Sequence, residues 1–343
     1  MSFSDLRSAR KSKESKSFVK SVITDAATED VVITKDTFSA AQDGGSGNSE
    51  IVSLENMSVG LPSTLEIRKS AAFGRSMYAK EQFAIGSVLI SVKPRIAVLS
   101  TAFLDSHCST CCNPATPAGL KRCTRCRTVW YCDAVFIFFQ ACQTRDWTLH
   151  KHECNALQQW AAVVPSSDLS VPSDAVRCLG RMLWYVQKKG ADSAWTKELN
   201  MMQSHRASLP SSASESYTHL AHFVVRYLGV GSPSDLANFG LSSAGDLVDL
   251  ISRFTTNTFT LSSFSLTPIG ICVAPVVALA NHSCEANAAI VFPFCNTAMQ
   301  EPQMQLIAIR PILQDEQTHS ELVKKPSTKR LRSNSKIPRK RNN

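Results

Sequence analysis

Eight cysteine and histidine side chains with the types and spacing of metal ligands are gathered between residues 108 and 154. Two C-x2-C pairs come first and four single ligands follow, namely Cys108, Cys111, Cys123, Cys126, Cys132, Cys142, His150 and Cys154. Thiolate and imidazole are the ligands that zinc prefers in proteins, and eight of them are enough for two closed tetrahedral sites. A stretch so rich in cysteine can bury little apolar surface, so bound metal would have to supply its folding free energy.

The spacing of the last two ligands and the start of the chain both bear on this interpretation. His150 and Cys154 lie four residues apart, so on a helix they would share one face and could reach one metal ion. Buried free cysteines and a disulfide framework are the alternatives. The chain opens on the polar sequence MSFSD without an apolar signal-peptide core, which favours a reducing compartment and therefore zinc. Cys112 and His152 keep neither spacing, and we expect them not to bind metal.

The ligand pattern resembles that of the MYND zinc finger. After the two C-x2-C pairs, the sequence continues with Trp130-Tyr131-Cys132 and then with Cys142-Gln143-x3-Trp147-x2-His150-x3-Cys154. Ligands interleave in that family, so the resemblance implies two mixed sets. One zinc would be held by Cys108, Cys111, Cys132 and Cys142, and the other by Cys123, Cys126, His150 and Cys154. The resemblance also implies that the finger binds partner peptides.

The spacing between the fifth and sixth ligands departs from that family. Nine residues separate Cys132 and Cys142 where the family has three, and the surplus equals the six residues 135–140, VFIFFQ. This apolar hexapeptide is unusual on a small polar module. One hypothesis is a translated intron end from a mistaken splice acceptor, and the other is a tolerated surface loop, because lengthening a loop costs little free energy. In either case both cysteines can still reach one zinc ion.

The rest of the chain divides by composition and periodicity. Residues 1–60 are rich in Ser, Lys, Asp and Gly without periodicity, and we predict that they are disordered. Helical periods over residues 155–250 predict a helical region, interrupted by Pro- and Ser-rich gaps at 165–173 and 208–216. Strands are predicted at 87–92, 270–273, 289–292 and 304–309. No apolar run approaches the ~20 residues that span a bilayer, so we expect no membrane partner.

A second motif, Asn281-His282-Ser283-Cys284-x2-Asn287, follows an apolar stretch and precedes a predicted strand. Alone it is typical of a polar turn. Together with Phe73-Gly74-Arg75 and with Phe254-x2-Asn257-x-Phe259, it resembles the SET domain of methyltransferases. A SET domain split by a MYND finger resembles the SET-and-MYND family of protein lysine methyltransferases, over residues 65–316 of this chain. That resemblance implies an α+β fold, with a β-rich SET domain interrupted by a finger at 108–154 and a helical insert at 155–250.

The resemblance also implies the chemistry of the site. S-adenosylmethionine would lie beside the Asn281 loop, with Asn281, His282, Asn257 and Arg75 as cofactor contacts and Phe259 in the channel of the substrate lysine. The sulfonium of that cofactor already activates the methyl group, so the protein mainly aligns the amine for attack. An apolar aromatic channel lowers the lysine pKa by desolvation and accommodates the methylated product. The implied function is therefore N-methylation of lysine in histones or other proteins, with zinc and S-adenosylmethionine as cofactors.

The resemblance ends near residue 316. The family continues with a strand that carries an active-site tyrosine and with a segment whose three cysteines would join Cys284 around a third zinc. Here no tyrosine follows Tyr227 and no cysteine follows Cys295. The chain therefore resembles a SET domain truncated at its C-terminal end, either through a frameshift or retained intron in the gene model or as a genuine short isoform. The competing hypothesis for the function is a catalytically inactive adaptor in which the finger binds partners.

The net charge of +9 is carried by the last part of the chain. Nine Lys and Arg residues and no acids lie between Lys324 and Arg341, so the remainder is close to neutral. We predict a disordered basic tail over residues 317–343. A nuclear localisation signal and a nucleic-acid contact are two hypotheses for the tail, and a translation product without a selected role is the third. We expect the protein in the nucleus, the cytoplasm or both, with nucleic acid contacted only through the tail.

Overall fold

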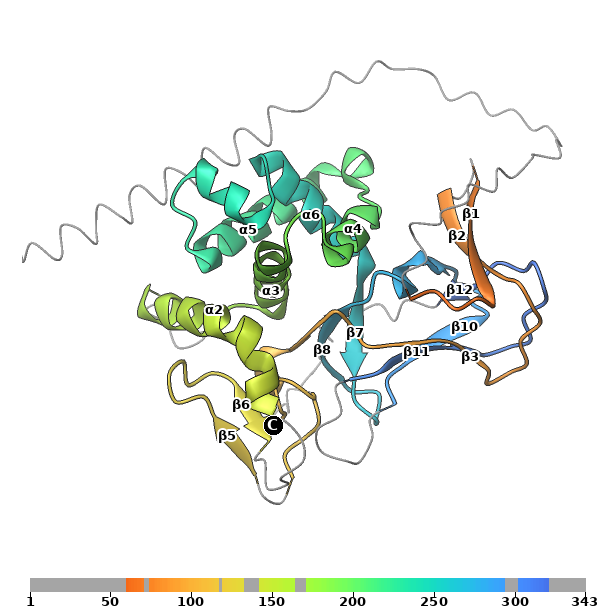
Figure 1. Ribbon diagram of the computed structural model, residues 1–343, viewed down its shortest axis with the longest axis horizontal. Coiled ribbons are helices and arrows are strands. Elements are labelled where there is room, and N and C mark those ends of the chain that lie inside the picture. The colour runs from red at the N-terminus through yellow and green to blue at the C-terminus, as the bar shows by residue number, and fades with distance from the viewer. Residues whose placement is uncertain are drawn as a thin grey trace, which may run out of the picture.

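The computed structural model describes residues 60–70, 74–116, 119–132, 142–163, 171–293 and 302–320. Strands gather on one side of the molecule and helices on the other, with the cysteine-rich segment below the helices in the view of Figure 1. The fold is therefore of the α+β class, as the sequence predicts. The expected disorder before Gly60, the hexapeptide 135–140 and the tail from residue 321 onward lie outside the described residues. No described helix is long and apolar enough to cross a membrane.

The described strands form two sheets and two hairpins. They are β1 (Leu65–Ser70), β2 (Gly74–Ala79), β3 (Val88–Val92), β4 (Ile96–Leu99), β5 (Leu120–Arg122), β6 (Trp130–Cys132), β7 (Thr258–Ser262), β8 (Pro268–Val273), β9 (Asn281–His282), β10 (Ala288–Val291), β11 (Met304–Ala308) and β12 (His319–Ser320). The larger sheet has the order β3-β11-β10-β12-β9 and the smaller has the order β4-β8-β7. β1 pairs with β2 and β5 pairs with β6, both as antiparallel hairpins.

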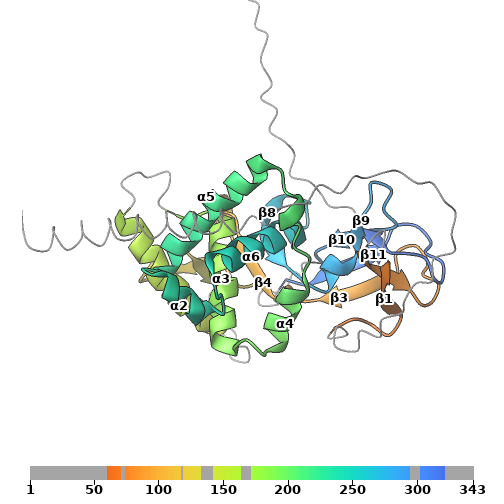
Figure 2. The same cartoon turned by 90° about the horizontal axis from the view of Figure 1, so that it is seen from above.

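The helices lie between the two halves of the strand-forming sequence. They are α2 (Cys142–Val163), α3 (Asp174–Lys189), α4 (Ala194–Met201), α5 (Ser211–Leu228) and α6 (Ala244–Asn257), with short 3-10 helices η1 (Thr101–Phe103), η3 (Arg206–Ser208), η4 (Pro233–Phe239) and η5 (Val277–Leu279). α3 packs against α2, α4 and α5 and also against β4 and β8. Figure 2 shows α3 among the other helices, so it is the central element of the helical side.

Strand and helix positions follow the predicted periodicity with one exception. The four predicted strands are confirmed as β3, β8, β10 and β11, and the predicted helical region contains α3 and α5. The Ser-rich gap expected at 208–216 is wrong beyond Pro210, because α5 begins at Ser211. There the hydroxyls of Ser216 and Thr218 donate to carbonyl oxygens one turn earlier, each at 3.0 Å. The hydroxyl groups thus find hydrogen-bond acceptors within the helix itself. A polar sequence can therefore remain helical here.

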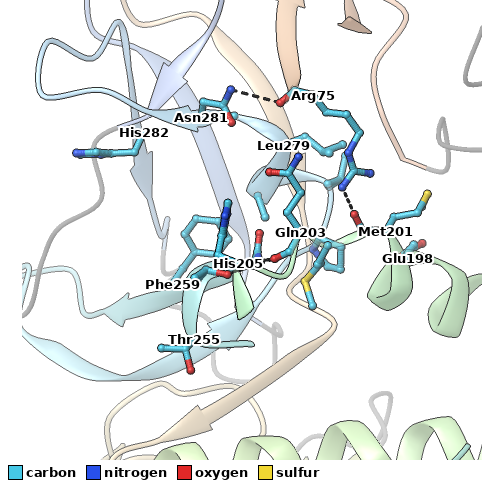
Figure 3. Close-up of a pocket in the computed structure, with 17 residues that line it drawn as sticks. Arg75, Glu198, Met201, Gln203, His205, Thr255, Phe259, Leu279, Asn281 and His282 are labelled. Atoms are coloured by element: carbon cyan, nitrogen blue, oxygen red, sulfur yellow. Dashed lines mark hydrogen bonds between the residues drawn. The ribbon is translucent and has the colours of Figure 1, made fainter. Parts of the chain in front are cut away.

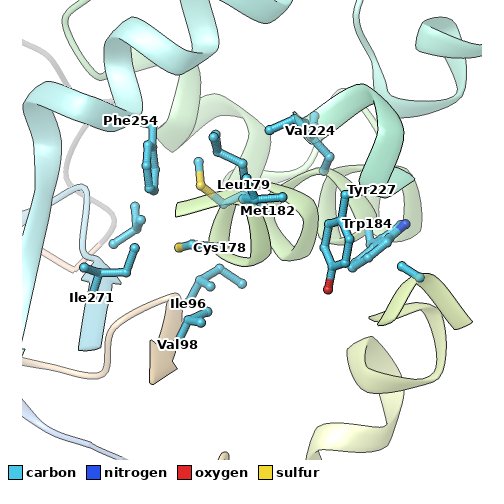
Figure 4. Close-up of a cluster of buried hydrophobic side chains, with 14 of the residues drawn as sticks. Ile96, Val98, Cys178, Leu179, Met182, Trp184, Val224, Tyr227, Phe254 and Ile271 are labelled. Atoms are coloured by element: carbon cyan, nitrogen blue, oxygen red, sulfur yellow. The ribbon is translucent and has the colours of Figure 1, made fainter. Parts of the chain in front are cut away.

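The larger apolar core lies between α3 and the β4-β8-β7 sheet. Figure 4 shows Ile96 and Val98 of β4 and Ile271 of β8 beside Cys178 of α3. α3 is buried on nearly all sides, through Val176, Arg177, Cys178, Leu179, Gly180, Arg181, Met182, Leu183, Trp184 and Val186. A second core, which includes Met77, Ile90, Phe259, Leu306 and Ile312, packs the β1-β2 hairpin onto the larger sheet.

The folded body reaches Ser320, so the boundary predicted at residue 316 is wrong. β12 pairs in parallel with β9 and β10. The backbone N–H of Thr318 donates to the carbonyl oxygen of Met77 at 2.8 Å, and that of His319 donates to Oδ1 of Asn287 at 2.7 Å. Nδ2 of Asn287 donates to the carbonyl oxygen of Gln317 at 2.8 Å. Hydrogen bonds hold this segment where apolar burial does not, and a search for apolar periodicity therefore misses it.

The close approach of β4 and β8 generates a test of this fold. Gly270 pairs with Leu99, and a Cβ atom on Gly270 would lie 2.2 Å from the carbonyl oxygen of Val98. Because strand backbones cannot move apart without breaking their ladder, Gly270→Ala is expected to lower the free energy of unfolding by about 2 kcal/mol. Urea denaturation measures the change.

A second glycine provides the matched control. A Cβ atom on Gly231 would find its nearest neighbour, Oδ2 of Asp235, at 3.7 Å, which is an ordinary contact. Gly231→Ala should therefore change the free energy of unfolding by less than about 0.5 kcal/mol. Equal denaturation midpoints for the two variants would contradict the packing of β8 on β4.

Candidate functional site

The eight expected zinc ligands form two compact sets, each contributed by separate segments of the finger. In each set the ligand atoms lie within 4.8 Å of one another. The sets are Cys108, Cys111, Cys132 and Cys142, and Cys123, Cys126, His150 and Cys154. These are the interleaved sets that the resemblance implies, so that grouping is confirmed. All donors are soft thiolate or imidazole groups in fours, which fits zinc.

The first set is built where the end of β6 meets the start of α2. Sγ of Cys111 lies 3.6 Å from Sγ of Cys132, and the backbone N–H of Cys132 donates to Sγ of Cys108 at 3.4 Å. Hydrogen bonds from Cys111 and Cys132 lower the pKa of Cys108 to about 7. The hydrogen bonds to Cys108 raise the pKa values of Cys111 and Cys132 in turn, and zinc would bind each cysteine of the set as a thiolate.

The second set brings the turn after β5 against one face of α2. Nε2 of His150 lies 3.4 Å from Sγ of Cys123 and 3.8 Å from Sγ of Cys126. The other ring nitrogen, Nδ1, lies 3.3 Å from Oε2 of Glu153. A carboxylate at Nδ1 fixes the imidazole tautomer and turns Nε2 toward the metal. The sequence predicts the ligand but not this supporting carboxylate.

Glu153 belongs to a buried ionic network that joins the finger to the helical insert. Its Oε1 accepts from Nε of Arg177 at 3.1 Å, and its Oε2 accepts from Nε of Arg181 at 3.0 Å. Arg181 also donates to both carboxylate oxygens of Asp146, at 2.8 and 2.9 Å, and Tyr131 donates to the same carboxylate at 2.8 Å. Burial alone would raise the pKa of Glu153, but Arg181 and Arg177 hold that pKa well below its ordinary value.

The arginines also decide how a third compact group should be interpreted. Asp146, His150 and Glu153 lie within metal-binding distance of one another. Their carboxylates already accept from Arg181 and Arg177, so the positive charge that a cation would supply is present. We therefore interpret this group as structural. The spacing of Arg177 and Arg181 places them on one face of α3, but nothing in the local sequence shows that this face is buried.

A cavity of about 410 Å³ lies where the SET-like strands meet the helical insert. Arg75, Asn257, Phe259, Asn281 and His282, the cofactor and substrate residues expected from the sequence, all line it, as Figure 3 shows for the four of them that it labels. They come from β2, near the start of the described chain, and from α6, β7 and β9, which lie more than 160 residues later. The sequence missed the lining contributed by α4 and the residues after it, namely Glu198, Met201, Met202, Gln203 and His205.

The side-chain amides of two asparagines form hydrogen bonds within the lining of the cavity. Nδ2 of Asn281 donates to Oγ of Ser76 at 2.8 Å and to the carbonyl oxygen of Arg75 at 3.3 Å. Nδ2 of Asn257 donates to the carbonyl oxygen of Gln203 at 3.2 Å. Each asparagine therefore ties one wall of the cavity to another. Both asparagines are expected cofactor contacts, and in this structure their Nδ2 groups donate to protein acceptors.

Arginine side chains from neighbouring elements hold the part of the cavity wall, at α4, that the sequence does not predict. The guanidinium of Arg75 donates to the carbonyl oxygen of Met201, and that of Arg253 donates to the carbonyl oxygen of Asn200. Burial, and then the charge of Arg253, lower the pKa of Arg75. Neither backbone carbonyl carries a sequence signal, and α4 is a short helix without a motif. The guanidinium of Arg75, which comes from β2, therefore favours an anionic group on a ligand in the cavity.

The two ligand sets predict the metal content of the chain. The full chain should contain two zinc ions, and Cys126→Ser should leave one at most and destabilise the finger, because a structural ligand and its metal-linked folding energy are lost. Metal analysis of the purified protein measures both. Cys112→Ser is the control, since Cys112 is buried but belongs to neither set. A parent protein with one ion or none, or a control that loses as much zinc, would contradict the assignment.

Comparisons with known proteins agree with this geometry. The family model of the MYND finger matches residues 107–154. Histone-lysine N-methyltransferase ASHR1 of Arabidopsis thaliana is 26% identical over 64% of this chain and 42% of its own length. N-lysine methyltransferase SMYD2 of Gallus gallus is 28% identical over 70% of this chain and 50% of its own length. The chain thus spans about half the length of the curated relatives it matches.

A solved structure of the SET domain of LSMT bound to lysine and AdoHcy aligns with 76% of this chain and 49% of its own, at 11% identity and a TM-score of 0.39. That score is too low to support an argument. The chain therefore carries a MYND finger with two complete ligand sets, and over 64–70% of its length it is similar to lysine methyltransferases such as ASHR1 and SMYD2.

Proposed function

We propose that this chain is an S-adenosylmethionine-dependent protein-lysine N-methyltransferase. The observation that carries the proposal is the cavity, on which five expected residues from β2, α6, β7 and β9 converge. The relatives are named as lysine methyltransferases, and their similarity covers 64–70% of this chain. Histones or other proteins are the proposed substrate class, and the nucleus, the cytoplasm or both are the proposed location.

The lining of the cavity fits a sulfonium cofactor. Its size is within the usual range of small-molecule sites, roughly 300–1,000 Å³. Arg75 would hold a carboxylate, while Val276 and Leu279 add apolar surface to the lining. When bound, the cofactor supplies an activated methyl group, so the chain need only position the amine that accepts it.

Phe259 is the residue we propose for the substrate lysine. It lies on β7, lines the cavity and is only 5% exposed. A lysine amine brought against a buried aromatic ring is desolvated, which lowers its pKa and leaves more of the neutral, nucleophilic form. The same ring face favours a methylated ammonium by a cation–π contact. Phe259 therefore serves both the reacting amine and its product.

A second candidate function is that of an adaptor. No tyrosine is among the described residues that line the cavity, and a family methyltransferase would have one there, as the resemblance implies. In the adaptor hypothesis the finger binds protein partners, and the cavity is a remnant. The two functions differ in one measurable respect, since only the enzyme transfers a methyl group.

Cofactor binding is the first test of the proposal. Asn281→Ala removes the hydrogen bonds that hold the Arg75 turn, and should weaken binding of S-adenosylhomocysteine by about tenfold, within the roughly 1–3 kcal/mol cost of such bonds. Titration calorimetry on the full chain measures the affinity. Asn238→Ala is the control, because Asn238 is exposed on η4 and does not line the cavity. Absence of binding by the parent, or equal losses in both variants, would contradict a cofactor site here.

Methyl transfer separates the enzyme from the adaptor. The full chain, incubated with labelled S-adenosylmethionine and mixed histones, should label lysine, and Phe259→Ala should lower the turnover without removing zinc. Cofactor binding by the parent without any labelling of lysine would favour the adaptor. Labelling that is unchanged in Phe259→Ala would show that the proposed lysine channel is wrong.

A further inference from the structure

The outer face of α5 carries three side chains of the types that bind metal ions. Glu215, His219 and His222 follow one another at intervals of four and three residues, so they share one face over two turns of the helix. Glu215 and His219 are exposed and His222 is half-buried, so that face is turned away from the core. Figure 2 shows α5 at the edge of the helical side. We call these three residues the α5 cluster.

The side chains of the α5 cluster have no structural task within the described part of the chain. None of the three forms a hydrogen bond or an ion pair with another described residue. The acids of the next helix differ in this respect, because Asp246 caps the start of α6 and Asp249 pairs with Arg253. Glu215 is the one acid of α5 and does neither. The carboxylate and the two imidazoles are therefore available to a ligand.

The two imidazole rings lie at a spacing close to that of ligands on one metal ion. Their centroids are 6.4 Å apart, and their planes meet at 42°. With metal–nitrogen bonds of about 2.1 Å, two imidazoles on one ion have centroids roughly 5–6.5 Å apart. The ligand atoms of the α5 cluster do not yet meet within the 4.8 Å found in the finger. Exposed side chains change rotamer within nanoseconds, so rotation of the side chains is enough to close the set.

The charges around the α5 cluster favour a bound cation. Burial, and then the charge of His219, lower the pKa of His222, so this imidazole is neutral near pH 7 and offers a lone pair to a metal. α5 contains no lysine, and its one arginine, Arg226, holds its guanidinium 5.1 Å from the ring centroid of Trp160 on α2. The carboxylate of Glu215 is thus the one anionic group on this helix face.

We propose that the α5 cluster binds one divalent transition-metal ion, and that zinc is the ion its donors suit. Two imidazoles and one carboxylate form a ligand set that zinc accepts, with water in the fourth position. Magnesium and calcium prefer sites made of oxygen ligands, so two imidazoles disfavour both. The site is separate from the finger and has three protein ligands in place of four. Its ion should therefore be bound more weakly than those of the finger and exchange more readily.

Titration of the full chain with zinc, after the finger has been loaded, tests the proposal. Calorimetry near neutral pH should show one additional ion per chain, bound with a dissociation constant in the micromolar range. The added zinc should also raise the midpoint of thermal unfolding, because an ion that binds only the folded state stabilises it. Cobalt(II) in place of the added zinc should give weak ligand-field absorption without a sulfur charge-transfer band, since the α5 cluster contains no thiolate.

Single substitutions locate the additional ion on the molecule. His219→Ala should weaken its binding by at least about tenfold, because even a group that only supports a metal ligand contributes that much. Glu215→Gln should weaken it several-fold, because a neutral amide replaces the carboxylate. His205→Ala is the matched control, since it removes an exposed histidine outside α5, and it should bind as the parent does. Each variant must keep the zinc of the finger and the helix content of the parent by circular dichroism, which excludes loss of folding as the cause.

Three results would overturn the proposal. The first is a parent chain that takes up no zinc beyond that of the finger, or takes it up only at millimolar concentration as an adventitious ion. The second is a folded His219→Ala variant that binds the additional ion as the parent does, or a His205→Ala control that loses as much affinity. The third is a sulfur charge-transfer band from the added cobalt, which would assign the ion to a cysteine outside the α5 cluster.

Discussion

The buried carboxylate of Glu153 is the group on which the described structure most depends. It supports the zinc ligand His150 on one side and accepts hydrogen bonds from Arg177 and Arg181 of α3 on the other. Removing one partner from a buried ion pair costs about 3–5 kcal/mol, since the remaining charge is left without compensation. The finger and the helical insert therefore cannot separate without a large loss of stability. The finger is thus a built-in part of the folded body.

That constraint extends from the finger to the cavity. α3 packs on β4 and β8, and residues between 275 and 282, after β8, line one part of the cavity. Just before β4, Nε of Arg95 donates to Oε2 of Glu198 at 3.0 Å, and Glu198 lies in the opposite wall on α4. The positions of both cavity walls therefore depend on an ordered α3. Zinc, although distant from the cavity, contributes to its shape through this chain of packed elements.

The sequence predicts the parts of this molecule whose signals are local. Cysteine spacing identifies the ligands, and apolar alternation places β3, β8, β10 and β11. Other features depend on pairing between distant segments and leave no local pattern. β12 and the residue before it are held by hydrogen bonds to Oδ1 of Asn287 and to the carbonyl oxygen of Met77, so their polar sequence carries no apolar strand pattern. The wall at the end of α4 is held through the carbonyl oxygens of Met201 and Asn200, which accept from Arg75 and Arg253. Arg177 and Arg181 lie four residues apart on α3. They can be buried because α2 supplies the carboxylates that pair with them.

Hydrogen exchange of the full chain, with and without removal of zinc by a chelator, measures the coupling between finger and insert most directly. We predict that zinc removal raises the exchange of amides in α3 together with those in α2, because His150 and Glu153 lose their fixed positions. The pairing of β3 with β11, which touches neither ligand set, should keep its protection and serves as the internal reference. Loss of protection in α2 with unchanged exchange in α3 would contradict the coupling and would make the finger an independent module.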